Sequence, residues 1–168
     1  MNAESELAFV ALGSNLGDSE RILRSAMNRI QSLTEAPIAS SSLWATPPID
    51  CPPGSPDFIN AVVGFKPRTD ESPESLLRKL LEIEAEFGLR PRRIPNEPRP
   101  LDLDLIAFGI EARNSPELKL PHPRAHERSF VLAPLAELAP GMTLPGQSLP
   151  ISQLLAERPD ASAIRRLD

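Results

Sequence analysis

The sequence has little of what defines several protein classes. Its single cysteine, Cys51, cannot form an internal disulfide, which fits a reducing compartment. No stretch approaches the roughly 18 consecutive apolar residues that a membrane helix needs. The first ten residues, MNAESELAFV, lack the basic and apolar regions of a signal peptide. We therefore expect a cytoplasmic protein with no membrane partner.

Basic residues are also fewer than acidic ones. The 168 residues include 18 Lys and Arg against 23 Asp and Glu, which gives a formal net charge of −5. This balance, together with the lack of paired surface aromatics on strands, argues against a nucleic-acid-binding module. The arginines nevertheless gather in residues 90–99, so a local basic site remains compatible with the sequence.

Glycine-rich nucleotide-binding motifs are missing as well. The chain contains neither G-x-x-x-x-G-K-[ST] nor G-x-G-x-x-G. The segment GSNLGD, which starts at Gly13, resembles neither of them. It is either a tight turn between a strand and a helix or a place where the backbone groups of Gly13, Ser14 and Asn15 lie near a ligand.

Proline, in contrast, is abundant. Its 20 residues concentrate in three stretches, 46–56, 90–100 and 120–130. Because proline fixes φ, these stretches are expected to be stiffened loops. Hydrophobic residues make up 40% of the chain, and its length suits one domain over residues 1–168. We expect a packed core with three stiff loops.

Apolar periodicity predicts a mixed α+β chain. The predicted strands are Leu7–Leu12, Ile38–Trp44, Phe58–Phe65 and Leu101–Phe108, followed by a short segment near Leu118–Leu120. The predicted helices run from Asp18 to Pro37, from Ser72 to Gly88, from Phe130 to Leu138 and from Ile151 to Ala156. The order β-α-β-β-α-β is that of a ferredoxin-like α+β sandwich, with an antiparallel sheet, helices on one face and extra C-terminal helices.

Two carboxylates interrupt the last main strand, RPLDLDLIAFG. Side chains alternate along a strand, so Asp102 and Asp104 share one face while the leucines take the other. Two neighbouring carboxylates repel each other, and a divalent cation would remove that cost. Mg²⁺ suits such oxygen ligands. The alternative is a solvated face or a structural ion-pair cluster with nearby arginines such as Arg99.

The two histidines, His122 and His126, lie in a proline-containing loop. Together with the two aspartates they could suggest zinc. They do not lie on a regular helix face, however, so magnesium is the better interpretation. Each histidine taken alone is typical of a loop residue.

Five motifs occur in order along the chain: FVALGSNLGD from Phe9, TPP from Thr46, PDFINAVV from Pro56, PRPLDLDLIAFG from Pro98 and LPHPRAHERSFVLAPLAELAP from Leu120. Together they resemble the 6-hydroxymethyl-7,8-dihydropterin pyrophosphokinases of folate biosynthesis. The resemblance implies transfer of diphosphate from ATP to the hydroxymethyl group of the pterin, with AMP as the other product. It also implies two Mg²⁺ ions held by Asp102 and Asp104, small-molecule substrates only, and a monomer.

The resemblance also implies roles for further residues. The pterin site would be formed by Thr46, Pro47, Ile49, Phe58, Asn60 and Phe130, with the two phenylalanines on either side of the ring. The ATP site would be formed by Glu84, Arg99, His122 and Arg128, with Arg92 and Arg99 among the catalytic residues. The family's G-R-x-R pattern after the second helix is replaced here by GLRPRR, so Arg90 and Arg92 are each displaced by one position.

A second hypothesis is a ligand-binding domain of the same ferredoxin-like fold without catalysis. Such a domain would have no need of the aspartate pair. The presence of both Asp102 and Asp104 therefore favours the enzyme.

Overall fold

A computed structural model describes residues 3–48, 51–88 and 98–167. Within them the strands are β1 (Ala8–Ser14), β2 (Ala39–Ser40), β3 (Leu43–Thr46), β4 (Phe58–Phe65), β5 (Asp102–Phe108), β6 (Arg113–Asn114), β7 (Lys119–Leu120) and β8 (Arg165–Leu167). The α-helices are α1 (Ser19–Gln31), α2 (Pro73–Glu86), α3 (Ser129–Leu138) and α4 (Ile151–Ala156). Three short 3₁₀ helices are η1 (Ala3–Glu6), η2 (Ala125–Glu127) and η3 (Ala161–Ala163).

The main sheet has the strand order β5-β1-β4-β3-β8, and β2 also pairs with β4. All of these pairings are antiparallel. The predicted α+β chain with an antiparallel sheet is thus confirmed. A separate two-stranded sheet is formed by β6 and β7.

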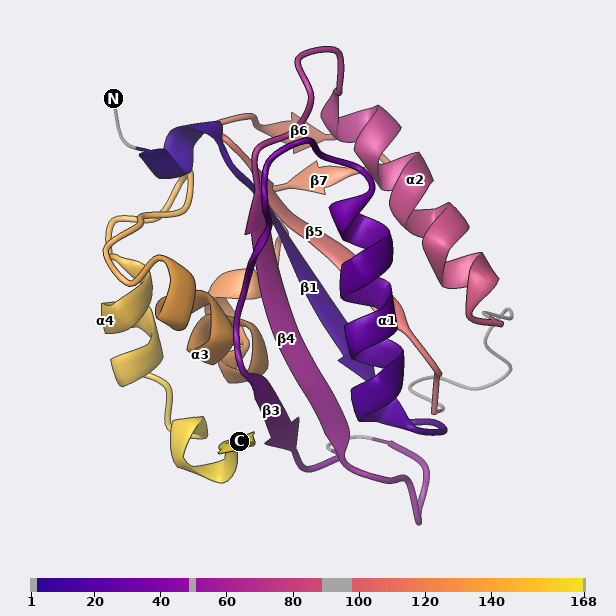
Figure 1. Ribbon diagram of the computed structural model, residues 1–168. Coiled ribbons are helices and arrows are strands. Elements are labelled where there is room, and N and C mark those ends of the chain that lie inside the picture. Colours follow the sequence, from indigo (N-terminus) through magenta and orange to yellow (C-terminus); the bar gives the residue numbers. More distant parts are fainter. Residues whose placement is uncertain (1–2, 49–50, 89–97, 168) are drawn as a thin grey trace.

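Two hydrophobic cores lie on opposite faces of the main sheet (Figure 1). One face is covered by α1 and α2, whose buried residues include Leu23, Ile30 and Leu80. The other face is covered by α3 and α4, where Leu132 and Ile151 are fully buried. Since β1 and β4 lie between the two cores, they contain nearly continuous apolar runs.

The helix starts follow their sequence signals. The Asp18 side chain accepts a hydrogen bond from the backbone N–H of Arg21, as expected of an N-cap. At α2, Ser72 and Ser75 form a reciprocal capping box around Pro73. Gly88, with φ +85°, follows the end of this helix, as predicted.

Two predicted boundaries were wrong. Helix α1 ends at Gln31 and not at Pro37, because the Ser32 hydroxyl donates to the carbonyl of Arg29 and competes with helix continuation. The predicted strand Ile38–Trp44 is split into β2 and β3. At the break, the Ser41 hydroxyl accepts a hydrogen bond from the N–H of Val62, in place of a backbone carbonyl.

No helix in the described part of the chain combines the length and apolar character needed to cross a membrane.

A tight contact at the centre of the sheet gives a stability prediction. A Cβ on Gly64 would lie 2.8 Å from a ring carbon of Phe9, whose side chain is only 1% exposed. Because the ring has no space to move into, Gly64→Ala should lower the free energy of unfolding by about 1–3 kcal/mol. Urea unfolding of the two proteins measures the difference.

Gly141→Ala is the matched control, since a Cβ there meets no atom within 4 Å. Its free energy of unfolding should stay within about 0.5 kcal/mol of the wild-type value. Equal effects of the two substitutions would contradict the packing described for Phe9.

Candidate active site

Asp102 and Asp104 project from the same face of β5. Both are partly exposed, while Leu103 and Leu105 between and beyond them are buried against the α1–α2 core. The alternation predicted from the sequence is therefore present. It keeps the two carboxylates out of the leucine core and at the surface of the sheet.

A β-bulge follows this pair. Val10 of β1 faces Leu105 and Phe9 faces Ala107, so Ile106 is the extra residue on β5. The carbonyl of Ile106 accepts a hydrogen bond from the N–H of His122 at 2.8 Å. This bond holds the start of the loop that carries His122 beside β5.

Arg99 lies just ahead of β5 and is held from two sides. Its Nη1 is 3.1 Å from Oδ1 of Asp102. Its backbone N–H donates to Oδ1 of Asn15 at 2.9 Å, and its carbonyl accepts from the N–H of Asn15 at 3.1 Å. Asn15 is 1% exposed, and its Nδ2 has no hydrogen-bond partner among the described residues. Asn15 thus joins the β1–α1 turn to the arginine next to the aspartate pair.

Glu84 adds a third carboxylate from α2. It is buried at the border of an apolar stripe. Burial, followed by the negative charge of Asp102, raises the pKa of Glu84 to about 7, although Arg99 opposes the shift. Asp104 raises this pKa as well. We call Glu84, Asp102 and Asp104 the carboxylate cluster.

His122 and Arg128 approach Asp104 from the segment after β7. Burial is the main cause that lowers the pKa of both side chains, and the charge of Asp104 acts in the opposite direction. Asp104 and His122 also line a cavity of about 230 Å³ beside β5. Its other walls include apolar residues such as Leu105 and Leu118.

The predicted pterin residues meet where β3 and β4 pair. Thr46 is in register with Phe58, and the buried side chain of Asn60 donates a hydrogen bond to the hydroxyl of Thr46. Gly13 faces Asn60 on one side and Asp102 on the other. A Cβ at Gly13 would lie 3.1 Å from Oδ1 of Asn60, so the glycine makes room for this amide.

The other predicted residues are placed as follows. Phe130 is the second residue of α3 and is half-buried. The Arg128 guanidinium lies 5.5 Å from the centroid of its ring. Pro47 is exposed directly after β3. Ile49 and Arg92 lie outside the described residues, as does Arg90.

Sequence analysis missed the side-chain contact of Asn15 and the packing reason for Gly13. An asparagine in a strand-to-helix turn is ordinary, and no local pattern shows that its partner lies 84 residues away. That backbone groups of residues 13–15 lie near a ligand stays a prediction.

Paired carboxylates next to arginines at one end of a sheet are typical of enzymes that transfer phosphoryl groups with metal assistance. A protein-family model identifies one family within this class of enzymes. The model for 7,8-dihydro-6-hydroxymethylpterin-pyrophosphokinase (HPPK) matches residues 9–140. The chain therefore belongs to the HPPK family, as the five motifs predicted.

Two curated relatives agree with this assignment. The chain is 40% identical over 153 residues to the 2-amino-4-hydroxy-6-hydroxymethyldihydropteridine pyrophosphokinase of Pseudomonas aeruginosa. The aligned residues cover 90% of this chain and 91% of the relative. It is 38% identical over 135 residues to the protein of the same name from Bacillus subtilis, with 80% and 78% covered.

Solved structures support the fold. A triple mutant of Plasmodium falciparum HPPK-DHPS, crystallised with pteroate, superimposes with a TM-score of 0.73 over 95% of this chain. The present chain spans about half of that protein (46%), and the two are 14% identical. At this identity the likeness shows the fold alone.

The raised pKa of Glu84 predicts a pH effect on the metal-free protein. The folded-state pKa of about 7 exceeds the ordinary glutamate pKa of 4.5, so the folded state binds an extra proton between these pH values. The stability contributed by Glu84 is therefore complete below pH 4.5 and is lost as the pH rises through 7. Glu84→Gln should remove this loss, on the order of 3 kcal/mol between pH 5 and 9.

Chemical unfolding across this pH range, with a chelator present, measures the effect. Glu82→Gln is the control, because Glu82 lies on the exposed side of the same helix. It should keep the wild-type pH dependence. Parallel curves for Glu84→Gln and the wild type would contradict the shifted pKa.

Proposed function

We propose that this chain transfers diphosphate from ATP to the hydroxymethyl oxygen of 6-hydroxymethyl-7,8-dihydropterin, giving AMP and the pterin diphosphate, as a step in folate biosynthesis. The pterin oxygen would attack the β-phosphorus, the bond from that phosphorus to the α-phosphate would break, and the hydroxyl proton would be released. The observation that carries the proposal is the Asp102–Asp104 pair beside Arg99 in a chain that belongs to the HPPK family.

The Asp102–Asp104 pair fits Mg²⁺. The two side chains offer hard oxygen ligands on one face of β5. No group of three or more His, Cys, Asp or Glu among the described residues could hold a metal, so the protein would supply only this pair. Mg²⁺ commonly binds one or two carboxylates and completes its shell with phosphate oxygens and water. Two bound Mg²⁺ ions would neutralise the triphosphate and orient the reacting oxygens.

The cationic side chains would bind the triphosphate. Arg99 is held in place by Asn15 and lies next to Asp102, while His122 and Arg128 lie near Asp104. Glu84 would lie on the nucleotide side, and the apolar walls of the 230 Å³ cavity would contact the nucleoside. Arg92 would add a further phosphate contact from outside the described residues.

The pterin would lie at the paired ends of β3 and β4. Thr46 and Asn60 are hydrogen-bonded to each other. Their remaining donor and acceptor atoms can form hydrogen bonds with the polar edge of the pterin ring. Phe58 and Phe130 would cover its two faces, with Pro47 and Ile49 at the wall. The Arg128 guanidinium lies over one face of the Phe130 ring. The pterin would therefore stack on the other face, or it would stack on this face after the Arg128 side chain has moved toward the triphosphate.

The remaining expectations belong to the same proposal. We infer one catalytic domain over residues 1–168, working as a monomer in the cytoplasm. The strand order β5-β1-β4-β3 with α1 and α2 on one face supports a ferredoxin-like core. The alternative of a non-catalytic ligand-binding domain gains no support, because both aspartates are present and partly exposed.

An AMP assay tests the function. The protein is incubated with ATP, Mg²⁺ and 6-hydroxymethyl-7,8-dihydropterin, and AMP should form only when the pterin is present. Asp102→Asn and Asp104→Asn should each lower turnover by roughly 10³-fold or more, because charge neutralisation is the main source of catalysis here. Their melting temperatures should stay equal to or above that of the wild type, since each removes carboxylate repulsion.

Asp70→Asn is the matched control, because Asp70 lies in an exposed loop and should retain full turnover. AMP that forms equally without the pterin would overturn the proposed reaction. Unfolding of both aspartate variants would instead support a purely structural ion-pair cluster.

The contact between Asn15 and Arg99 gives a second prediction. Asn15→Ala removes the acceptor for the Arg99 N–H, so the guanidinium is positioned less accurately against the phosphates. We expect kcat/KM for ATP to fall by roughly tenfold to a hundredfold. The Kd for the pterin, measured by calorimetry, should change less than twofold.

Asn114→Ala, at an exposed position of β6, serves as the control and should leave both constants unchanged. Equal losses toward ATP and pterin would show that Asn15 acts only on folding.

A further inference from the structure

A hydrogen bond joins the start of α3 to the C-terminal segment of the chain. The hydroxyl of Ser129, the first residue of α3, donates to Oδ1 of Asp160 at 2.6 Å. Ser129 is only 1% exposed. A hydroxyl that donates to a carboxylate at this distance forms a short, charge-assisted hydrogen bond, which is stronger than one between neutral groups. The contact therefore restrains the first turn of α3.

Ser129 lies between two residues of the proposed site. Arg128 precedes it and would bind the triphosphate, and Phe130 follows it and would cover one face of the pterin. The backbone of Arg128 has restraints of its own, because its N–H donates to the carbonyl of Ala125 at 3.3 Å and its carbonyl accepts from the N–H of Leu132 at 2.9 Å. The Ser129 side chain adds a contact from this turn to a distant part of the chain, 31 residues away.

Asp160 is itself held by its neighbours. It precedes η3, and its carbonyl accepts a hydrogen bond from the N–H of Ala163 at 3.0 Å. The N–H of Ala161 donates to the carbonyl of Arg158 at 3.4 Å. The Nε of Arg158 lies 3.7 Å from Oδ1 of Asp160, the same oxygen that accepts from Ser129. The carboxylate is thus fixed in place before any ligand binds.

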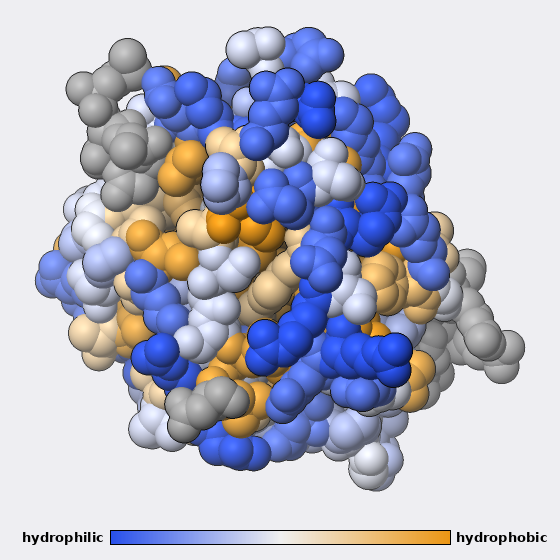
Figure 2. Space-filling view, in the orientation of Figure 1, coloured by the Kyte–Doolittle hydropathy of each residue, from blue (hydrophilic) through white to orange (hydrophobic). Residues whose placement is uncertain are grey.

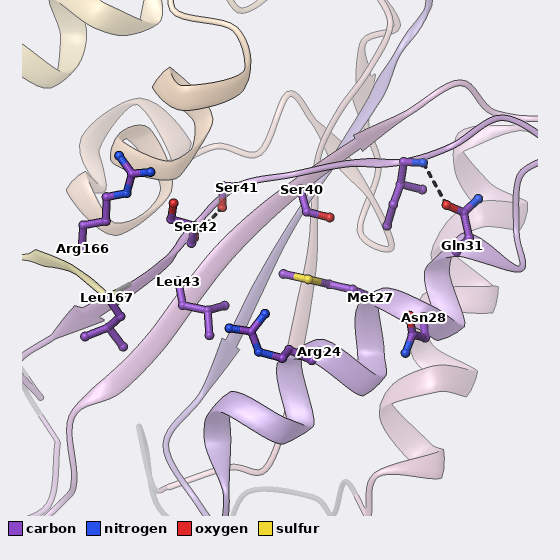
Figure 3. Close-up of a pocket in the computed structure, with 11 residues that line it drawn as sticks. Arg24, Met27, Asn28, Gln31, Ser40, Ser41, Ser42, Leu43, Arg166 and Leu167 are labelled. Carbon is purple, nitrogen blue, oxygen red and sulfur yellow. Dashed lines mark hydrogen bonds between the residues drawn. The ribbon is translucent and has the colours of Figure 1, made fainter.

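The segment 157–164, which contains Asp160, is anchored at both ends. Before it, α4 packs against α3, and Ile151 of α4 is fully buried. After it, β8 pairs with β3, so that Leu167 faces Leu43. Figure 3 shows these two leucine side chains on the same side of the strand pair. Since β3 ends at Thr46, the C-terminal part of the chain contacts both elements that carry proposed pterin residues.

The same segment also reaches the protein surface. It lies in the lower left of Figure 1, where Figure 2 shows both hydrophilic and hydrophobic surface. Ile164 is 9% exposed, whereas the side chain of Asp160 is 45% exposed. Asp160 can therefore be substituted without leaving a cavity in the core.

We propose that Asp160, acting through Ser129, is a positioning residue for pterin binding. The match to the HPPK family model ends at residue 140, so Asp160 lies beyond the matched region. The inference rests on the proposed function, because it takes Phe130 as one face of the pterin site. The hydrogen bond would hold the first turn of α3, and with it the Phe130 ring, where the ring can stack. Stacking depends on the offset and distance of the rings, and a ring that is already in place loses less entropy on binding.

Steady-state kinetics of AMP formation test the proposal. Ser129→Ala and Asp160→Ala each remove the hydrogen bond, so KM for the pterin should rise roughly tenfold while kcat changes less than threefold. The Phe130 ring would contact the pterin away from the reacting oxygen, so the ground state and the transition state lose the same interaction. A purely structural role would lower the folded fraction, which lowers the apparent kcat and leaves KM unchanged.

A direct binding measurement accompanies the kinetics. The Kd for the pterin is measured by calorimetry in the presence of Mg²⁺ and α,β-methylene ATP, whose bridge between the α- and β-phosphorus cannot be cleaved in the reaction. In Asp160→Ala this Kd should rise by the same factor as KM.

A double variant and a conservative variant identify the contact itself. The double variant Ser129→Ala with Asp160→Ala should bind the pterin no more weakly than either single variant, because all three lack the same hydrogen bond. Asp160→Asn keeps an oxygen that can accept from the Ser129 hydroxyl. Its KM for the pterin should stay within roughly threefold of the wild-type value.

Two matched controls separate positioning from stability. Thr34→Val removes a comparable hydroxyl, which donates to the carbonyl of Lys66 at 2.6 Å, beyond the end of β4 opposite Phe58. It should lower the melting temperature about as much as Ser129→Ala does, with an unchanged KM for the pterin. Glu157→Ala removes an exposed carboxylate from the same segment and should change neither quantity.

An unchanged KM and Kd in Asp160→Ala, additive losses in the double variant, or an Asp160→Asn variant as impaired as Asp160→Ala would overturn the proposal. A rise of the same size in Thr34→Val would do so as well. A wild-type protein that forms no pterin-dependent AMP would instead overturn the proposed function. The calorimetric Kd would then still test the role of Asp160, because that measurement requires no turnover.

Discussion

Burial of Glu84 beside the Asp102–Asp104 pair is the constraint on which the electrostatics of the site depend. Glu84, Asp102 and Asp104 come from a helix and a strand, and each aspartate contributes to holding the pKa of Glu84 near 7. Such an arrangement is unfavourable in an isolated protein and becomes favourable when cations and a polyphosphate are bound. The fold therefore maintains a local electrostatic cost at the position where the proposed substrate would remove it.

The backbone around the cluster explains how this cost is tolerated. The pleat of β5 directs the leucines into the α1–α2 core, so burial of Leu101, Leu103 and Leu105 anchors the strand while the aspartates face outward. The bulge at Ile106 then turns the strand and provides the carbonyl that holds His122. On the other side, Asn15 holds Arg99. Local packing and backbone hydrogen bonds, and not the charges themselves, fix the geometry of the site.

Much of this arrangement could be predicted from the sequence. The alternation LDLDL directly gives the two faces of β5, and the Ser72–Pro73 signal gives the start of α2, because both depend on local periodicity and capping. The β2–β3 break at Ser41 and the early end of α1 could not be predicted, since side-chain hydroxyls there compete with the backbone for hydrogen bonds. The bulge at Ile106 and the contact of Asn15 with Arg99 depend on strand register and on a partner distant in sequence. The function emerged from five motifs in order, whereas each motif alone had an ordinary structural explanation.

The most direct test of the account is a carbon-13 NMR titration of the Glu84 carboxyl group in the metal-free protein. The account predicts that Glu84 titrates with a pKa of about 7 in the wild type and at lower values in Asp102→Asn and Asp104→Asn, because each substitution removes a negative charge that raises this pKa. A Glu84 pKa near 4.5 in the wild type, or one that neither substitution changes, would contradict the carboxylate cluster as the organising feature of the site.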